Sequence, residues 1–281
     1  MKSFLSGILR LFFNFNLIRK KFHGINRMII TPLKLTRGVQ KKVRLENDIT
    51  MNLEIEDWIP RNLYFTGHYE KAEILFLKNN LNVGDVFIDV GANIGLHTLS
   101  ASKFVEQKGK VFSFEPFKKN YDLLKENISL NNLSNISAYK KALSNKSGSL
   151  EIFFDSSKNN TGTVSLFNDV STYSEKVESI TLDSFVEKEN IKEISLIKID
   201  VEGAEYLALL GMKKVLQKFH PILLIEIDEK ILKRTPHTKG QIIDFLTSLN
   251  YQIHFMCFNG SISKTDSSYK TFNYVFLKEE I

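Results

Sequence analysis

Two acids on either side of a glycine-rich turn are the residues of this chain best suited to hold a nucleoside. Asp89 ends an apolar run, the turn after it carries Gly91, Asn93 and Gly95, and a second apolar run ends in Glu115. Glycines let a ligand approach the backbone, a helix start offers free N–H groups to an anion, and an acid on the next strand suits a ribose diol. The pattern predicts a nucleoside-bearing cofactor.

The glycine spacing separates two cofactor classes. Dinucleotide oxidoreductases cradle a pyrophosphate with G-x-G-x-x-G, whereas this turn reads G-x-N-x-G behind an acid. That form resembles the first motif of class I S-adenosylmethionine-dependent methyltransferases. A nicotinamide-dependent oxidoreductase with the same kind of sheet remains the alternative enzyme, and a non-catalytic membrane-associated binding module is the alternative outside enzymes.

Three more acids, Asp200, Glu202 and Glu205, follow another apolar run within six residues. Their mutual repulsion raises pKa values unless a cation or hydrogen-bond donors balance them, and a sulfonium cofactor is one such cation. Glu202 also suits the first turn of a helix, where acids are favoured. Glu226 interrupts a later apolar run, so it must have a partner or border a pocket.

The stretches DVGANIG at 89–95 and KIDVEGAE at 198–205 together resemble the signature of the FkbM family of methyltransferases. Shorter matches lie at 142–144 and 181–185, and the resemblance covers about residues 67 to 226. It implies S-adenosylmethionine as cofactor and O-methylation of a sugar or another small-molecule hydroxyl, since family members serve polyketide and surface-glycan pathways. No metal is implied.

The resemblance also implies roles for single residues. Asp89 lies near the methionyl amino group, Glu115 binds the ribose, and Leu143 and Ser144 border the adenine. Asp200 closes the fourth strand and faces the methyl group, as a catalytic or substrate-orienting acid.

Glu205 holds the loop or the substrate. Tyr69 and Glu70 form a lid or cofactor edge, although Tyr69 also suits a core position. His97, in the first turn after the glycine loop, is either a base at the pocket or a packed histidine.

Net charge is +6, but its distribution argues against a nucleic-acid partner. Residues 1–50 carry eleven Lys or Arg and two acids, 11 − 2 = +9, so the rest of the chain carries 27 − 30 = −3. The only cysteine, Cys257, excludes an internal disulfide and favours a reducing, cytoplasmic compartment. The chain has no P-loop, G-x-S-x-G elbow or H-E-x-x-H motif. The sequence therefore does not indicate an NTPase, a hydrolase of the common serine type or a metal site.

Residues 1–56 form a basic extension that precedes an expected methyltransferase domain at 57–281. Phe4, Ile8 and Phe12 lie at helical spacing, but Arg10 and two asparagines interrupt a stretch already too short to span a bilayer. Residues 1–21 suit a basic amphipathic helix on the inner face of a bacterial cytoplasmic membrane, or equally a helix packed on protein.

Apolar runs alternate with helix-like segments from residue 69 onward. This alternation predicts an α/β, three-layer, doubly wound and mostly parallel seven-stranded sheet with an antiparallel terminal strand, preceded by an N-terminal helical extension. Residues 135–144 suit the third strand and 147–154 an inserted hairpin arm. Residues 155–163 suit a loop, and 251–256 with 274–277 the terminal antiparallel pair.

Overall fold

The computed structural model describes residues 2–13, 15–154, 164–167, 173–265 and 272–279. Contacts divide the chain into two units, the first ending at Glu70 and the second beginning at Lys71. Within the described part, no helix is both long enough and apolar enough to cross a membrane.

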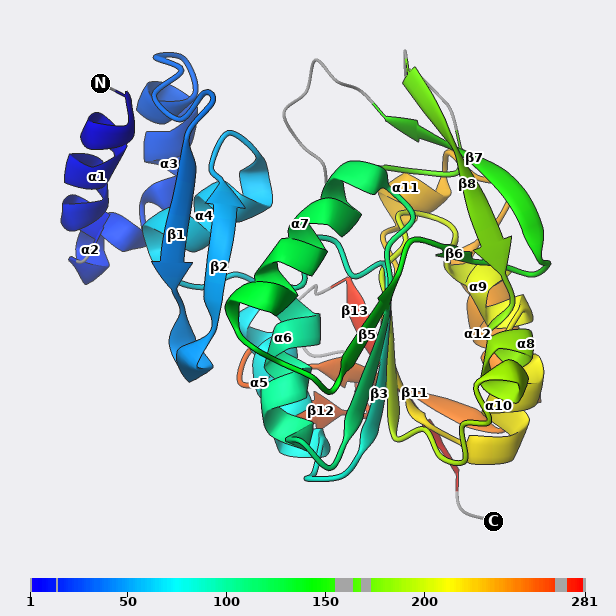
Figure 1. Ribbon diagram of the computed structural model, residues 1–281. Helices are drawn as coiled ribbons and strands as arrows, with labels where there is room; N and C mark the ends of the chain where they lie inside the picture. The colour runs from blue at the N-terminus through cyan, green and yellow to red at the C-terminus, as the bar shows by residue number, and fades with distance from the viewer. Residues whose placement is uncertain (1, 14, 155–163, 168–172, 266–271, 280–281) are drawn as a thin grey trace. The chain divides into compact units, whose positions relative to one another are not determined.

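The first unit is a set of short helices beside a two-stranded antiparallel hairpin (Figure 1). Its elements are α1 (Lys2–Phe13), α2 (Asn16–Arg19), α3 (Phe22–Ile25), η1 (Asn26–Ile30), β1 (Gln40–Arg44), η2 (Glu46–Asp48), β2 (Thr50–Glu54) and α4 (Trp58–Thr66). Phe13, Phe22 and Phe65 meet in its core, with ring centroids 5.1 to 6.0 Å apart. Because Phe65 belongs to α4, this unit continues past the boundary expected at residue 56.

The second unit is built on an eight-stranded sheet ordered β12-β11-β13-β10-β9-β3-β4-β5. Its strands are β3 (Val86–Val90), β4 (Lys110–Phe114), β5 (Ile136–Tyr139), β9 (Leu196–Ile199), β10 (Ile222–Glu226), β11 (Tyr251–Met256), β12 (Ile262–Ser263) and β13 (Asn273–Lys278). β5, β4, β3, β9 and β10 pair in parallel, and β13 runs antiparallel to both β10 and β11. The expected doubly wound sheet is confirmed, with the two-residue β12 as an eighth strand.

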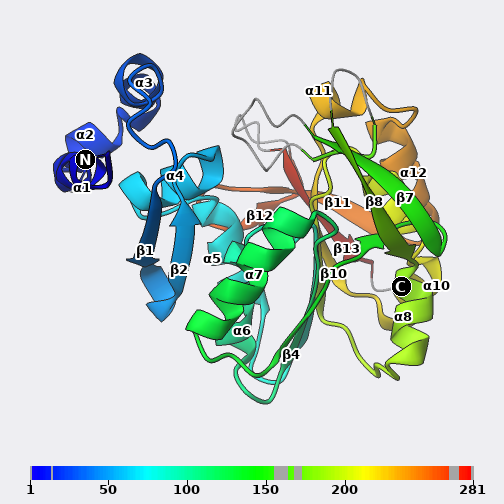
Figure 2. The same cartoon turned by 45° about the horizontal axis from the view of Figure 1, so that its top comes forward.

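Helices cover both faces of this sheet (Figure 2). One face carries α5 (Lys71–Asn80), α6 (Leu96–Val105) and α7 (Lys118–Leu130), and the other carries α8 (Leu182–Lys188), α9 (Glu205–Leu210), α10 (Lys213–Phe219), α11 (Glu229–Leu232) and α12 (Lys239–Ser248). Phe76 and Ala101 pack on the first face, while Phe185, Leu216 and Leu246 pack on the second. The strands are apolar on both sides because both sides are buried.

The stretch 135–144 differs from its expected single strand. It divides into β5 and the two-residue β6 (Ala142–Leu143), which leaves the main sheet and joins the order β6-β8-β7. β7 (Gly148–Phe154) and β8 (Tyr173–Ile180) form the expected antiparallel hairpin arm. The predicted loop at 155–163 lies outside the described residues.

Candidate active site

Asp89 lies within β3 and is fully buried. Its Oδ2 accepts a hydrogen bond from the Thr98 hydroxyl at 2.6 Å, and that hydroxyl also lies 2.9 Å from Ser113 Oγ. Its Oδ1 has no hydrogen-bond partner among the described residues. Burial raises the pKa of Asp89, against the attraction of Lys198. A buried carboxyl that lacks one hydrogen bond is costly, which makes Asp89 a candidate for contact with a ligand.

The glycine turn is held against its neighbours so closely that side chains do not fit. A Cβ at Gly91 would lie 1.8 Å from the Asp200 carbonyl oxygen, and a Cβ at Gly95 would lie 2.6 Å from Leu124 Cδ1. Both glycines have positive φ, as does Asn93 at 49°, whose side chain accepts from the Ile94 N–H at 2.8 Å. The turn therefore brings the ends of β3 and β9 into direct backbone contact.

Glu115 follows β4 and is oriented by the backbone. Its Oε2 accepts from the Asn93 N–H at 2.8 Å and its Oε1 from the Phe117 N–H at 2.9 Å. Each oxygen has a further lone pair with which to accept a hydrogen bond from a hydroxyl. Burial raises the pKa of Glu115 to about 7, and Asp89 and Asp200 add to the rise, so the three acids lie close enough to interact.

Lys198 places a positive charge inside the sheet, where it is 3% exposed. It lies opposite Asp89 in the β3–β9 register, and its Nζ forms an ion pair with Asp200 Oδ2 at 2.7 Å. Burial opposes ionisation of Asp200, but Lys198 and a hydrogen bond with Glu226 outweigh it and lower the pKa of Asp200. Asp200 is therefore an ionised carboxylate at neutral pH with 23% of its side chain exposed.

The polar groups continue across the sheet toward β13. Glu226 pairs in register with Asn273, whose amide donates to Glu73 Oε1 at 2.6 Å. Burial raises the pKa of Glu73, and Lys198 counteracts this rise. We call Glu73, Asp89, His97, Lys198, Asp200, Glu226 and Asn273 the polar layer. Its members come from four neighbouring strands and from α5 and α6.

His97 belongs to this layer and is buried. Burial lowers the pKa of His97 well below its usual value, with Lys198 acting in the same direction. The imidazole is therefore neutral at physiological pH, and in this state one ring nitrogen donates a hydrogen bond and the other can accept one.

Glu205 and Glu202 shape the loop after β9. Glu205 Oε1 accepts from the Gly203 N–H at 2.9 Å and the Val201 N–H at 3.4 Å. Burial raises the pKa of Glu205 to about 7. Glu202 adopts φ of 51°, and its carbonyl accepts from Ser165 Oγ at 2.9 Å. Both are placed to fix the loop that carries Asp200.

The remaining expected site residues lie in other places. Leu143 is buried in the core at the end of β6, and the Ser144 N–H donates to Ile180 O at 3.0 Å. Tyr69 and Glu70 belong to the first unit, and Glu70 has a positive φ of 47°.

Three members of the polar layer, Glu73, Lys198 and Asn273, are absent from the residues expected on sequence grounds. Lys198 carries a recognisable signal, because a lysine inside the apolar run Leu-Ile-Lys-Ile must find anionic partners once it is buried. Glu73 and Asn273 are 200 positions apart in sequence, and nothing local indicates that they meet.

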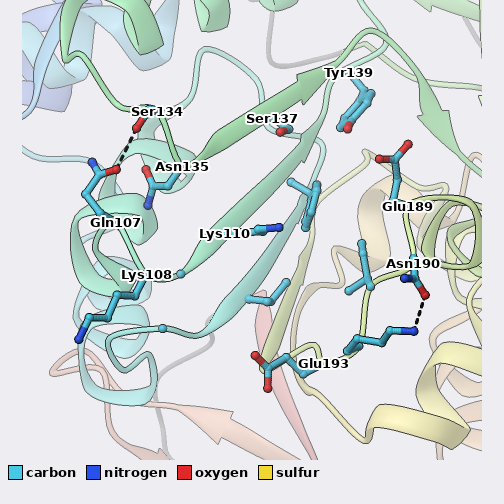
Figure 3. A pocket seen from close by; sticks show the side chains of 16 residues that line it. Gln107, Lys108, Lys110, Ser134, Asn135, Ser137, Tyr139, Glu189, Asn190 and Glu193 are labelled. Carbon is cyan, nitrogen blue, oxygen red and sulfur yellow. Dashed lines mark hydrogen bonds between the residues drawn. The ribbon is translucent and has the colours of Figure 1, made fainter.

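A large cavity lies at the opposite edge of the sheet, and it contains none of these acids. Figure 3 shows Ser137 and Tyr139 on its sheet side and Glu189, Asn190 and Glu193 on its loop side. Its volume is about 530 Å³, and Gly84 and Lys110 place it where β3 and β4 begin. Ligands of open α/β sheets bind beyond the carboxyl ends of the strands, so this cavity is not the expected cofactor site.

A doubly wound sheet with a glycine turn after β3 and an acid after β4 is typical of class I methyltransferases. The FkbM methyltransferase domain model matches residues 89–253, more than half of the chain. The chain belongs to the FkbM methyltransferase family, and this membership identifies S-adenosylmethionine as its cofactor.

Two relatives with similar sequences are named as methyltransferases. The chain is 32% identical over 158 residues to the hexuronic acid methyltransferase AglP of Haloferax volcanii, covering 56% of this chain and 62% of the relative. It is 27% identical over 162 residues to methyltransferase sdnD of Sordaria araneosa, covering 47% and 62%. The chain thus spans less than two thirds of either relative. The crystal structure of an FkbM methyltransferase from Methylobacillus flagellatus matches with a TM-score of 0.48 at 15% identity, covering 92% of this chain and 60% of that one.

The residues present fit this cofactor. Asp89 Oδ1 lacks a partner among the described residues, and Glu115 keeps lone pairs for a diol. Asp200, ionised and partly exposed, offers negative charge where a sulfonium is expected.

Proposed function

We propose that this protein transfers a methyl group from S-adenosylmethionine to a hydroxyl oxygen of a sugar or another small molecule. The observation that carries the proposal is the Lys198–Asp200 ion pair, which keeps a carboxylate ionised beside the glycine turn. A carboxylate in that position can orient an acceptor hydroxyl and take its proton as the hydroxyl becomes acidic.

The chain's residues divide the work. Glu115 would accept hydrogen bonds from the ribose hydroxyls, and Asp89 Oδ1 would accept one from the amino group of the cofactor. The sulfonium, when bound, would supply an electrophilic methyl group. Asp200 positions the acceptor, with Lys198 and Glu226 fixing its carboxylate. Holding both reactants in line is worth about 7–11 kcal/mol in such displacements. Glu205 keeps the Asp200 loop in place.

For the acceptor we propose a sugar used in surface-glycan synthesis. Support comes from the name of the Haloferax volcanii relative, a hexuronic acid methyltransferase, which makes hexuronic acids the first acceptors to test. We place the reaction in the cytoplasm, at the inner face of a bacterial membrane, on the strength of the single cysteine and the basic first fifty residues.

A radiolabelled methyl-transfer assay tests the function. Purified protein is incubated with labelled S-adenosylmethionine and with hexuronic acids, cell glycans and lipid-linked fractions, and Glu115→Ala is run beside it. Label should enter the glycan fraction with the wild type and be lost with Glu115→Ala. Equal transfer by both proteins would overturn the assignment of Glu115.

A parallel titration with S-adenosylmethionine and with NADH separates the oxidoreductase alternative. We expect heat release with S-adenosylmethionine alone. Binding of NADH without binding of S-adenosylmethionine would defeat the methyltransferase proposal.

A further inference from the structure

Helix α1 turns its apolar side toward solvent. At about 100° per residue, five of its apolar side chains fall on one side, and we call them the apolar stripe: Phe4, Leu5, Ile8, Leu11 and Phe12. Each is exposed, with Phe4 at 72% and Leu11 at 63%. A helix of a globular domain normally directs this side to the core. The amphipathicity of α1 is therefore inverted.

The opposite side of α1 explains why the stripe cannot turn inward. Phe13 is buried against Phe22 and Phe65, with ring centroids 5.6 and 5.1 Å away. The guanidinium of Arg10 lies 4.8 Å from the Tyr64 ring centroid. Ser6 is buried and shares a hydrogen bond with Tyr64. These contacts fix the rotation of α1 within its unit.

Exposed apolar side chains are concentrated in this segment. Of the fourteen exposed large hydrophobic residues in the described chain, ten lie between positions 4 and 33. Beyond the stripe they are Phe15, Leu17, Met28, Ile29 and Leu33. A concentration of this kind marks an interaction surface.

The charge of this segment indicates which partner binds the apolar stripe. The first 45 residues contain eleven Lys or Arg and no Asp or Glu. Lys20, Lys21, Arg27 and Lys34 are exposed within the same segment. A second copy of the chain would bring like charges together, whereas anionic lipid headgroups supply the complementary charge beside an apolar phase.

We propose that the apolar stripe and its neighbouring cations dock this protein on the surface of an anionic lipid bilayer. At twelve residues α1 is too short to span a membrane, so it lies in the headgroup region with the stripe directed to the acyl chains. Lys20 and Lys21 contact lipid phosphate. No step of the proposed methyl transfer is needed for this docking, so either can fail without the other.

Vesicle flotation of the full chain tests the docking without cofactor or acceptor. Vesicles of phosphatidylcholine alone are compared with vesicles containing phosphatidylglycerol, at low and high salt. Wild-type protein should float with the anionic vesicles and lose about tenfold in partitioning at high salt or without anionic lipid.

Two variant pairs locate the contact. Phe4→Ser with Leu11→Ser should reduce partitioning about tenfold or more, while Val83→Ser with Phe258→Ser, exposed apolar residues of the second unit, should leave it unchanged. Lys20→Gln with Lys21→Gln should weaken binding, whereas the exposed pair Lys213→Gln with Lys214→Gln should not.

Three results would overturn the proposal: no flotation of the wild type with anionic vesicles, equal flotation of the stripe variant, or a wild-type dimer in light scattering that the stripe variant dissociates. The salt and lipid comparisons use wild-type protein, so they decide the question even where a variant folds poorly.

Discussion

The two edges of the central sheet differ in what they bury. The amino edge has a cavity of about 530 Å³ lined by exposed side chains such as Lys108 and Glu193. The carboxyl edge has the polar layer, in which Asp89, Lys198 and Glu73 are buried. Hydrogen bonds hold Asp89 and Glu73, and an ion pair with Asp200 holds Lys198. Burying charged groups costs free energy, and empty volume between exposed side chains does not. We therefore assign the proposed methyl transfer to the end of the sheet that holds the buried polar groups, and not to the cavity.

Substitution of Asp200 should produce the largest difference between the edges. Asp200→Asn removes the ionised carboxylate but keeps its shape, and we expect kcat for methyl transfer to fall about 10²- to 10⁴-fold. Glu193→Gln, an exposed acid at the amino-edge cavity, should leave kcat unchanged. Initial rates with labelled cofactor measure both. Full activity of Asp200→Asn would remove Asp200 from the mechanism.

Removal of the buried lysine should chiefly affect folding. Lys198→Met leaves Asp200, Asp89 and Glu73 without their central cation, so we expect a loss of about 3–5 kcal/mol in the free energy of unfolding at pH 7. Lys110→Met, at the exposed start of β4, should change it by less than about 0.5 kcal/mol. Urea unfolding curves compare the two. Equal midpoints would show that Lys198 compensates no buried charge.

Glu205 should make stability depend on pH. Its folded pKa of about 7 exceeds the ordinary value of 4.5, so between these values the folded state retains a proton that the unfolded state has lost. The contribution of Glu205 to the free energy of unfolding is therefore fully present below pH 4.5, and it is lost as the pH rises through 7. Glu205→Gln should be more stable than wild type by about 2–4 kcal/mol at pH 8 and nearly equal at pH 4.5. Thermal unfolding of both proteins at both pH values measures this, and a difference in stability that is the same at pH 4.5 and pH 8 would contradict the prediction.

The smallest expected effect concerns cofactor affinity. With a pKa of about 7, Glu115 is mostly protonated at pH 6 and ionised at pH 8, and the ionised form accepts from both ribose hydroxyls. Affinity for S-adenosylmethionine should therefore be about tenfold higher at pH 8 than at pH 6. Glu115→Gln should bind weakly with no such difference. Calorimetric titration at both pH values measures this, and a wild-type affinity independent of pH would show that Glu115 does not titrate at the site.

Much of the sheet could be predicted from the sequence because its signals are local. The apolar runs at β3, β4 and β9 and the glycines after Asp89 indicate strand, turn and helix within a few residues of one another. The break between β5 and β6 could not be predicted, because β6 pairs with β8 some forty positions later along the chain.

The site divides in the same way. Asp89, Glu115 and Asp200 could be singled out because each ends or follows an apolar run. The bond from Asn273 to Glu73 could not, since it depends on β13 entering the sheet beside β10. The exposure of the apolar side of α1 could not be predicted from the sequence either, because it depends on the contacts that Phe13 and Arg10 make within the folded unit.

The backbone contact at Gly91 has a consequence for anyone redesigning this enzyme. Because even a methyl side chain at position 91 would lie 1.8 Å from the Asp200 carbonyl oxygen, the backbone after β3 and the backbone after β9 can pack this closely only with glycine at position 91. Libraries aimed at new acceptors should keep both positions constant and diversify residues farther from this contact. A shift at either position would displace the glycine turn and the Asp200 loop together, and with them both of the sites proposed for cofactor and acceptor.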